Sequence, residues 1–244
     1  MSKKNNKTVF FGKKRLQYYD GLLIRADLGL HQQIAERVQQ LLPKGSSILD
    51  LGAGQGALSA RLGDLGYTVT AVDIDPEDFK CKGIQFIQVN FNDNRAIESF
   101  KDKYQGTFDL VIGVEVIEHV ENPWEYVRLL KALAKTGGHI LISTPNVTSW
   151  LSRIHFLLKG KFHQFGESDL SYGHIAPITP WELSTILKYE NFKDVSITSA
   201  GTLPPVWIAP SVTTTLANML FLLVRPFSSG VVDGWCIMAV ARKM

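Results

Sequence analysis

The stretch ILDLGAGQG, residues 48–56, decides the fold of this chain. An apolar segment of strand length runs into three closely spaced glycines, and a helical pattern follows over residues 57–65. Glycines in such a turn let a ligand approach the backbone closely and leave free N–H groups at the start of the helix. The stretch therefore predicts a nucleotide-like ligand. It does not identify that ligand, because Gly52, Gly54 and Ala57 also satisfy the G-x-G-x-x-A pattern of dinucleotide-binding proteins.

The chain around this stretch alternates between apolar runs and helical patterns, which predicts an α/β fold. We expect a Rossmann-like, doubly wound, mostly parallel sheet with helices on both faces. Two helix starts are legible, because Asn122 and Thr179 each precede Pro-Trp-Glu, and we expect Gly137-Gly138 to end the first of these helices. The seven candidate strands are residues 47–51, 68–73, 85–89, 108–114, 139–144, 195–200 and 235–241.

The composition indicates a folded protein of a reducing compartment. The chain has 244 residues, 45% of them hydrophobic, and a net charge of +3. Its two cysteines, Cys81 and Cys236, are far apart and have no metal-ligand spacing, which predicts a cytoplasmic protein. Residues 1–15 carry six Lys or Arg and no acid, and we interpret them as a frayed basic tail or a contact for an anionic partner. We therefore divide the chain into residues 1–42, the tail with cap helices over 18–42, and the main domain, residues 43–244.

Two segments of the main domain, near residues 147–178 and 203–232, are predicted to be inserted lids. The first contains a basic amphipathic stretch over residues 150–165, in which we place His155 and His163 at the surface. The second has no charge over residues 206–224, yet it lies between two strands that should pair within one sheet, which argues against a membrane crossing. We interpret each segment as a cover over the substrate or a peripheral contact with the inner membrane surface. For the first segment, packing against the rest of the domain is the alternative.

Two acids beside the glycine turn narrow the choice of ligand. A carboxylate at Asp50, two residues before the first glycine, would repel a pyrophosphate but suits the sulfonium and ammonium groups of S-adenosylmethionine. Asp73 ends the second strand about twenty residues downstream, where an acid can accept hydrogen bonds from ribose hydroxyls. We therefore favour S-adenosylmethionine as the cofactor.

With these elements in the order described, and with EVIEH at residues 115–119, the chain resembles the class I S-adenosylmethionine-dependent methyltransferases over about residues 30–200. It is similar to the branch with ubiquinone-biosynthesis O-methyltransferases, methionine-biosynthesis-type enzymes and methyltransferases of surface-polysaccharide pathways. The resemblance implies that the last of the seven strands is antiparallel and that residues 88–91 lie beside the adenine. Many relatives have Asp at the position of Asn90, whose amide oxygen could still accept a hydrogen bond. The cofactor-binding residues expected on these grounds are Asp50, Gly52, Ala53, Gly54, Asp73, Ile74, Asn90, Phe91 and Glu115.

The EVIEH segment also supplies candidates for chemistry. Glu115, Glu118 and His119 have a spacing that would bring them to one side of a helix. With His174, they resemble the divalent-metal site of small-RNA 2′-O-methyltransferases. A cation such as Mg²⁺ held by these four residues would lower the pKa of a bound hydroxyl, and His119 or His174 could act as a base. The alternative is that Glu118 and His119 bond local backbone while His174 orders its loop.

These observations predict O-methylation of a small-molecule, quinone-precursor, glycan or glycolipid acceptor. A nucleotide-dependent oxidoreductase and a non-enzymatic cofactor-binding scaffold are the alternatives. RNA methylation is a remote option, since the sequence has no RNA-binding module and little basic character beyond the tail, so no nucleic-acid partner is expected.

Overall fold

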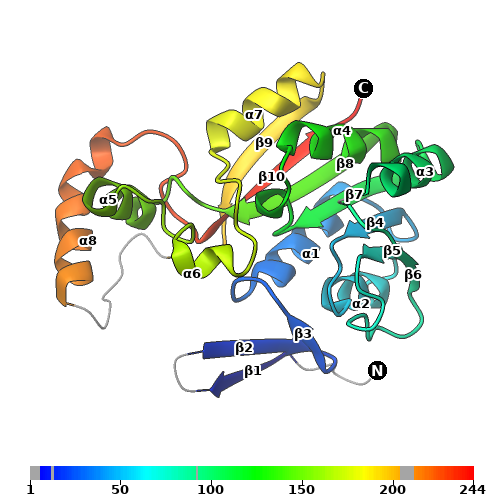
Figure 1. Cartoon of the computed structure of the whole chain (residues 1–244), viewed down its shortest axis with the longest axis horizontal. Coiled ribbons are helices and arrows are strands. Elements are labelled where there is room, and N and C mark those ends of the chain that lie inside the picture. The colour runs from blue at the N-terminus through cyan, green and yellow to red at the C-terminus, as the bar shows by residue number, and fades with distance from the viewer. Residues whose placement is uncertain (1–5, 12–13, 92, 204–211) are drawn as a thin grey trace.

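The computed structural model describes residues 6–11, 14–91, 93–203 and 212–244. A seven-stranded sheet crosses the molecule with helices on both faces (Figure 1). Its order is β6-β5-β4-β7-β8-β10-β9, and only β10 runs antiparallel to its neighbours, which confirms the predicted fold. The strands are β4 (Ser47–Leu51), β5 (Thr68–Asp73), β6 (Gln85–Gln88), β7 (Phe108–Val114), β8 (Ala134–Pro145), β9 (Lys193–Ala200) and β10 (Cys236–Arg242).

The pleat of the sheet divides the core into two halves. On β7, Val111 packs into one cluster of buried side chains, whereas Leu110 and Ile112 pack into the other. Because successive side chains of a strand point to opposite faces, a nearly unbroken apolar strand serves both halves. Helices α1 (Leu30–Leu41) and α2 (Ala57–Asp64) cover one face, while α3 (Asn94–Tyr104), α4 (Pro123–Leu133) and α7 (Pro180–Tyr189) cover the other.

The two helix starts read from the sequence are confirmed. The Asn122 side chain accepts hydrogen bonds from the N–H groups of Trp124 and Glu125 at the start of α4. The Thr179 side chain accepts one from the N–H of Glu182 at the start of α7. Each cap satisfies backbone donors that the first helical turn leaves without a partner.

The predicted end of α4 at Gly137-Gly138 is wrong. The helix ends at Leu133, and both glycines lie inside β8, where the register against β7 shifts. A Cβ atom on Gly138 would lie 3.1 Å from the carbonyl oxygen of Asp109 and 3.0 Å from that of Lys135. The glycine is therefore used for close approach of the backbone at a strand irregularity, and not as a helix stop.

The helical prediction for residues 18–42 is wrong in its first part. A three-stranded sheet forms instead, from β1 (Asn6–Phe11), β2 (Lys14–Tyr19) and β3 (Leu22–Ile24), and only α1 is helical. Residues 6–11 are thus paired in a strand, and the frayed-tail interpretation does not hold for them. Asp20 and Gly21, with φ of 50° and 80°, form the two-residue turn that joins β2 to β3. Asp-Gly is a strong hairpin signal, so the sequence did contain the evidence.

The two inserted segments form helices that project from one end of the molecule (Figure 1). The first insertion contains α5 (Trp150–Lys159) and the short α6 (Glu167–Leu170); the second contains α8 (Val212–Val224), followed by the 3-10 helix η2 (Arg225–Phe227). The buried Trp150 ring packs 6.3 Å from that of Phe221, centroid to centroid, and joins α5 to α8. Within the described residues no helix has the length and apolar character to cross a bilayer. Residues 204–211 of the second predicted lid lie outside the described residues, and none of the described residues of α8 lines the cavity at the carboxyl ends of β4, β5 and β7.

We expect the contact between Gly113 and Tyr126 to be non-additive on mutation. A Cβ atom on Gly113 would lie 1.9 Å from the Tyr126 hydroxyl oxygen, which is buried and has no hydrogen-bond partner among the described residues. Gly113→Ala should therefore reduce the free energy of unfolding by about 1–3 kcal/mol. Tyr126→Phe should cost almost nothing, since the hydroxyl makes no bond, and should recover part of the loss in the double variant. Urea unfolding of the four proteins measures this; an additive double variant would contradict it.

Candidate functional site

A cavity of about 970 Å³ opens at the carboxyl ends of β4, β5 and β7. This is where ligands bind in doubly wound sheets, because the loops leaving neighbouring parallel strands diverge there. The cavity brings together ten of the twelve site residues expected from the sequence, all except Asn90 and Glu118. The ten are Asp50, Gly52, Ala53, Gly54, Asp73, Ile74, Phe91, Glu115, His119 and His174.

The glycine turn forms one wall of the cavity. The N–H groups of Gly52 and Ala53 donate to the carbonyl of Val72 on the neighbouring strand, at 2.8 and 3.1 Å. Gly52 and Gly54 have φ of 77° and 53°, in the left-handed region that other residues adopt at a cost. A Cβ atom on Gly54 would meet no atom within 4 Å. That empty space, beside backbone N–H groups, is where a ligand can lie against the main chain.

Asp73 closes the turn from the end of β5. One of its carboxylate oxygens accepts from the Gly54 N–H at 2.8 Å, and the other accepts from the Ile74 N–H at 2.7 Å. These bonds hold the carboxylate at the edge of the cavity, with Ile74 half exposed next to it. The geometry suits an acceptor of hydrogen bonds from a diol.

The cavity is acidic. Its lining includes four carboxylates (Asp27, Asp50, Asp73 and Glu115) and one guanidinium, that of Arg25, which is paired with Asp78 at 2.8 Å. Asp50 is buried and accepts a hydrogen bond of 2.6 Å from the Ser59 hydroxyl. Burial raises the pKa of Asp50 to about 6, and the nearby charge of Asp73 acts in the same direction. Negative charge held in a poorly solvated cavity favours a cationic ligand over a pyrophosphate.

Glu115 lines the cavity and is hydrogen-bonded to side chains of two neighbouring strands. Its backbone has a positive φ of 54°, and its carboxylate accepts from the Ser143 hydroxyl at 2.9 Å and from the Cys236 thiol at 3.5 Å. Burial raises the pKa of Glu115 to about 7. The expectation that it joins Glu118 and the histidines as a fourth metal ligand is not met by this geometry, since only the other three cluster.

Glu118, His119 and His174 form that cluster. Their ligand atoms lie within 4.8 Å of one another, and the two imidazole rings meet edge to face with centroids 5.0 Å apart. Glu118 comes from the 3-10 helix η1 (Ile117–His119) and is fully buried; one oxygen accepts from the Thr144 hydroxyl at 3.0 Å. The other oxygen lies 3.9 Å from His119 Nε2 and has no hydrogen-bond partner among the described residues.

The loop after α6 brings His174 to this cluster. The N–H groups of Ile175 and Ala176 both donate to the Glu118 carbonyl at 3.0 Å, and His174 Nδ1 lies 2.9 Å from the Gln164 carbonyl oxygen. Burial, with the neighbouring His174, lowers the pKa of His119, which keeps its imidazole neutral near pH 7. A neutral imidazole can accept a proton or bind a cation.

Several cavity residues escaped the sequence analysis. Asp27 accepts hydrogen bonds from the Thr202 hydroxyl and caps the cavity. His31 contributes a buried Nδ1 that has no hydrogen-bond partner among the described residues, and burial lowers its pKa to about 3. Tyr172 and Trp235 complete the rim. No motif marks these positions; the charge of Asp27 after a strand was the only signal available.

Three expectations about individual residues need correction. Asn90 is exposed and does not line the cavity, although its neighbour Val89 is buried and its neighbour Phe91 is in the cavity lining. His155 and His163 are half-buried, and not at the surface. The His163 ring packs at 5.0 Å from Trp235, and His155 Nδ1 lies 2.8 Å from the Lys161 carbonyl oxygen, so both stabilise the insertion.

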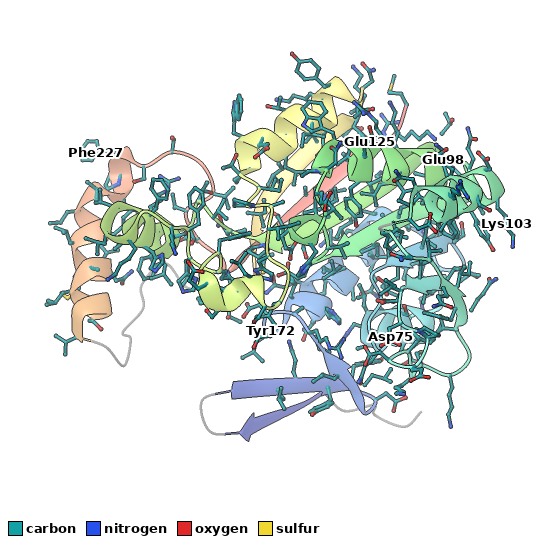
Figure 2. All side chains as sticks on the ribbon, viewed as in Figure 1. Asp75, Glu98, Lys103, Glu125, Tyr172 and Phe227 are labelled. Atoms are coloured by element: carbon teal, nitrogen blue, oxygen red, sulfur yellow. The ribbon has the colours of Figure 1, made fainter. Side chains whose placement is uncertain are left out.

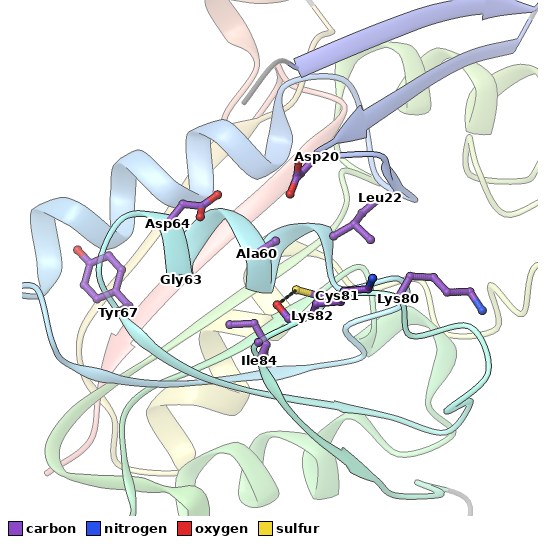
Figure 3. A pocket seen from close by; sticks show the side chains of 11 residues that line it. Asp20, Leu22, Ala60, Gly63, Asp64, Tyr67, Lys80, Cys81, Lys82 and Ile84 are labelled. Atoms are coloured by element: carbon purple, nitrogen blue, oxygen red, sulfur yellow. Dashed lines mark hydrogen bonds between the residues drawn. The ribbon is translucent and has the colours of Figure 1, made fainter. Parts of the chain in front are cut away.

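A second, smaller cavity of about 450 Å³ lies beside α2 (Figure 3). Its labelled lining includes Ala60, Asp64 and Tyr67, together with Cys81, whose thiol donates to the Lys82 carbonyl at 3.8 Å. It shares no residue with the lining of the central cavity. Apart from Asn90, the predicted site residues all belong to the central cavity or its buried edge.

Comparison with known proteins identifies the family of this chain. A family model described as a methyltransferase domain matches residues 27–197, which include the sheet up to β9 and the whole acidic cavity floor. This chain belongs to that methyltransferase family. The methyltransferase domain therefore accounts for the glycine turn, and the oxidoreductase alternative loses its basis.

Curated relatives of this methyltransferase domain include a ubiquinone biosynthesis O-methyltransferase from Xanthomonas axonopodis pv. citri, 35% identical over 112 residues. The match covers 45% of this chain and 47% of the relative, so the chain spans about half the length of the curated relatives it matches. A similar relative comes from Xanthomonas campestris pv. campestris, 35% identical over 107 residues, with 43% of this chain and 45% of the relative covered.

Among solved structures, a SAM-dependent methyltransferase from Archaeoglobus fulgidus has a TM-score of 0.61 at 20% identity, covering 87% of this chain and 94% of the other. Phosphoethanolamine N-methyltransferase 2 of Haemonchus contortus, solved with S-adenosyl-L-methionine, has a TM-score of 0.55 at 14% identity, covering 90% and 54%. At these identities the likeness establishes the fold alone, a Rossmann-like methyltransferase fold.

Gly52 and Gly54 should respond differently to the same substitution. Gly52→Ala adds a strained φ and places its Cβ 2.5 Å from Val116, so it should cost roughly 2–5 kcal/mol in the free energy of unfolding. Gly54→Ala has the strain without the collision and should cost about 1–2 kcal/mol. Chemical unfolding of both variants in the absence of ligand makes the comparison. Equal losses would mean that the Val116 contact is not the constraint.

Proposed function

We propose that this methyltransferase domain moves the methyl group of S-adenosylmethionine onto a hydroxyl of a small-molecule acceptor. The observation that carries the proposal is an acidic cavity built on the glycine turn, with the neutral His119 in its lining and the buried Glu118 beside that histidine. An acidic cavity suits a cationic methyl donor, and a neutral imidazole beside it suits removal of a hydroxyl proton. The relatives named for ubiquinone O-methylation support a hydroxyl as the accepting group.

The residues of the cavity fit that cofactor. Asp73, at the end of β5, is the acceptor for the ribose hydroxyls, and Ile74 and Phe91 offer apolar surfaces to the adenine. Gly52, Ala53 and Gly54 leave room at the backbone, and Asp50 and Glu115 supply negative charge for the amino-acid end. We also propose that Asn90, exposed beyond β6, accepts a hydrogen bond from the adenine amino group. This contact requires the loop to close over the ligand. When bound, the cofactor supplies a methyl group already activated by positive sulfur.

The protein's share of the chemistry is positioning and proton removal. His119 takes the proton of the acceptor hydroxyl, and Glu118, whose pKa burial raises well above its usual value, supports the imidazole from behind. His174 adds a second imidazole beside that of His119. Holding the deprotonated oxygen in line with the activated methyl accounts for the rate, because the leaving group needs no further help.

A divalent cation is the finer part of this proposal. Glu118, His119 and His174 offer one carboxylate and two imidazoles within 4.8 Å, which fits a cation with open positions for a hydroxyl. Two imidazoles favour a transition ion such as Mn²⁺ or Zn²⁺ over Mg²⁺, which prefers oxygen ligands. A cation there would also ionise Glu118 and replace its missing hydrogen-bond partner.

The acceptor class follows from the lining of the cavity. Among the described residues, the lining has one guanidinium, which is already paired, and no lysine, so a neutral or phenolic acceptor fits better than a phosphorylated one. We propose a quinone precursor, a glycan or a lipid-linked molecule as the acceptor, and a location in the cytoplasm or at the inner surface of the membrane. The two free cysteines support a reducing compartment.

The cofactor assignment is tested by thermal shift with S-adenosylmethionine, S-adenosylhomocysteine, NAD and NADP. We expect the two adenosyl ligands alone to raise the midpoint of unfolding. Gly54→Ala should fold but lose the shift, because its Cβ fills the space beside the turn.

The thermal shift with S-adenosylmethionine should grow as the pH rises through about 6, since Asp50 becomes ionised there. Asp50→Asn should flatten this rise.

A shift with NAD instead of the adenosyl ligands would contradict the assignment. If the cofactor binds, transfer of labelled methyl to a panel of catechols, prenylated phenols and glycans tests the activity itself. Labelling of amines alone would contradict O-methylation.

The cation is tested by calorimetric titration of the purified chain with Mn²⁺ or Zn²⁺. We expect His119→Gln and His174→Gln each to weaken binding by about tenfold or more, because each removes one of three protein ligands. His155→Gln is the matched control, being half-buried outside the cluster. Methyl transfer should fall on chelation and return with the metal. Binding that is absent in the native chain, or equally weak in the control, would leave His119 as a base without a cation.

A further inference from the structure

Helix α8 presents its apolar side to solvent. No charged residue occurs along it, and the side chains that face outward recur at helical spacing: Leu216, Met219, Leu220 and Leu223. Leu220 is 65% exposed and Leu223 is 72% exposed, whereas the polar Asn218 is turned inward and buried. A helix on the surface of a protein in water normally has the reverse arrangement. An exposed apolar stripe of this kind is typical of a contact site.

The stripe continues at the end of the molecule that α5 and α8 share. Leu157 and Leu158, in the last turn of α5, are 83% and 69% exposed, and Phe156 next to them is half exposed. Beyond α8, Phe227 is 88% exposed, and Figure 2 shows it at the outer edge of the molecule, far from the sheet. We call these residues the α5–α8 surface: Phe156, Leu157, Leu158, Leu216, Met219, Leu220, Leu223 and Phe227.

The charges at this surface have one sign. Residues 150–161 and 212–227 contain Arg153, Lys159, Lys161 and Arg225 and no acid. Lys161 and Arg225 are paired with carboxylates just outside these ranges, Glu167 and Asp233. The Arg153 guanidinium donates only to carbonyl oxygens, at 2.7 Å, and so keeps its charge. Among the described residues no carboxylate is paired with Lys159, so the rim of the surface carries net positive charge.

We propose that the α5–α8 surface docks on an anionic lipid bilayer, with α8 lying in the plane of the interface. A helix of 13 residues is about 20 Å long, enough to lie along a bilayer and too short to cross it. Leu, Met and Phe side chains would enter the acyl boundary, while Lys159 and Arg153 would meet the headgroups. A second copy of this chain would match the apolar stripe but would bring its own positive rim against this one, which favours the lipid.

The chain that follows the docked surface contributes to the lining of the cavity. The chain that leaves α5 passes through Gln164, Tyr172 and His174, all of which line the cavity, and Tyr172 is exposed at its rim (Figure 2). An acceptor dissolved in the same lipid would thus reach His119 without crossing the protein. This consequence rests on the proposed function, whereas the docking does not.

The experiment is sedimentation of the full chain, without acceptor, with phosphatidylcholine vesicles and with phosphatidylcholine–phosphatidylglycerol vesicles. We expect the chain to pellet with the mixed vesicles and to remain in solution with phosphatidylcholine alone. Leu220→Glu/Leu223→Glu and Leu157→Glu/Leu158→Glu should each lower the partition coefficient by about tenfold or more, because each adds charge where apolar contact is needed. Trp181→Glu, at an exposed aromatic residue of α7 outside the surface, is the matched control and should bind as the native chain does.

Thermal shift with S-adenosylhomocysteine on each variant separates this result from misfolding and from failure of the proposed cofactor. Light scattering of each protein without lipid distinguishes binding to vesicles from self-aggregation. Pelleting that survives both double substitutions would overturn the proposal, and so would equal pelleting with neutral vesicles. A dimer in solution that the same substitutions dissociate, with no pelleting, would assign the surface to a second copy instead.

Discussion

Two backbone hydrogen bonds at the end of β4 organise this molecule. The N–H groups of Gly52 and Ala53 both turn toward the carbonyl of Val72 at the end of β5, and this is possible because Gly52 adopts a positive φ. The chain therefore leaves the sheet sharply and begins α2 after Gly56. The space so created becomes the central cavity, and the carboxylates that line it come from strand ends that this turn keeps open.

The concentration of buried acids at this place has an energetic consequence. Burial raises the pKa values of Asp50 and Glu115 to about 6 and about 7, so the unliganded protein holds negative charge there at a cost to stability above those pH values. A cationic ligand relieves that cost. Binding and stability are thus linked through the same carboxylates, which is a common property of functional sites.

The two ends of the molecule serve different purposes. The sheet and its five covering helices form a closed core in two halves, with apolar strands between them. Helices α5 and α8 instead meet through Trp150 and Phe221, a small satellite cluster, and leave most of their apolar side chains uncovered. Burial of the two core halves stabilises the folded domain. The exposed apolar side chains of α5 and α8 add little to that burial, and we interpret them as a contact surface.

The sequence by itself determined the α/β class, the seven strands and the glycine turn, because each depends on local periodicity and on residues with a restricted backbone. It also determined Asp50 and Asp73, whose positions follow directly from the ends of two strands. It could not determine that Glu115 turns toward Ser143 and Cys236 while Glu118 turns toward the histidines, since a 3-10 helix replaced the expected regular helix and changed which side chains converge.

Only the tertiary structure decided the rest of the site. His174 reaches His119 across 54 intervening residues because two backbone N–H groups bond the Glu118 carbonyl, and His31 enters the cavity because α1 packs against the sheet. The outward direction of the apolar side of α8 depends likewise on Phe221 docking against Trp150. Contacts between residues far apart in the chain leave no periodic signal, and that is the physical reason the sequence could name candidates without arranging them.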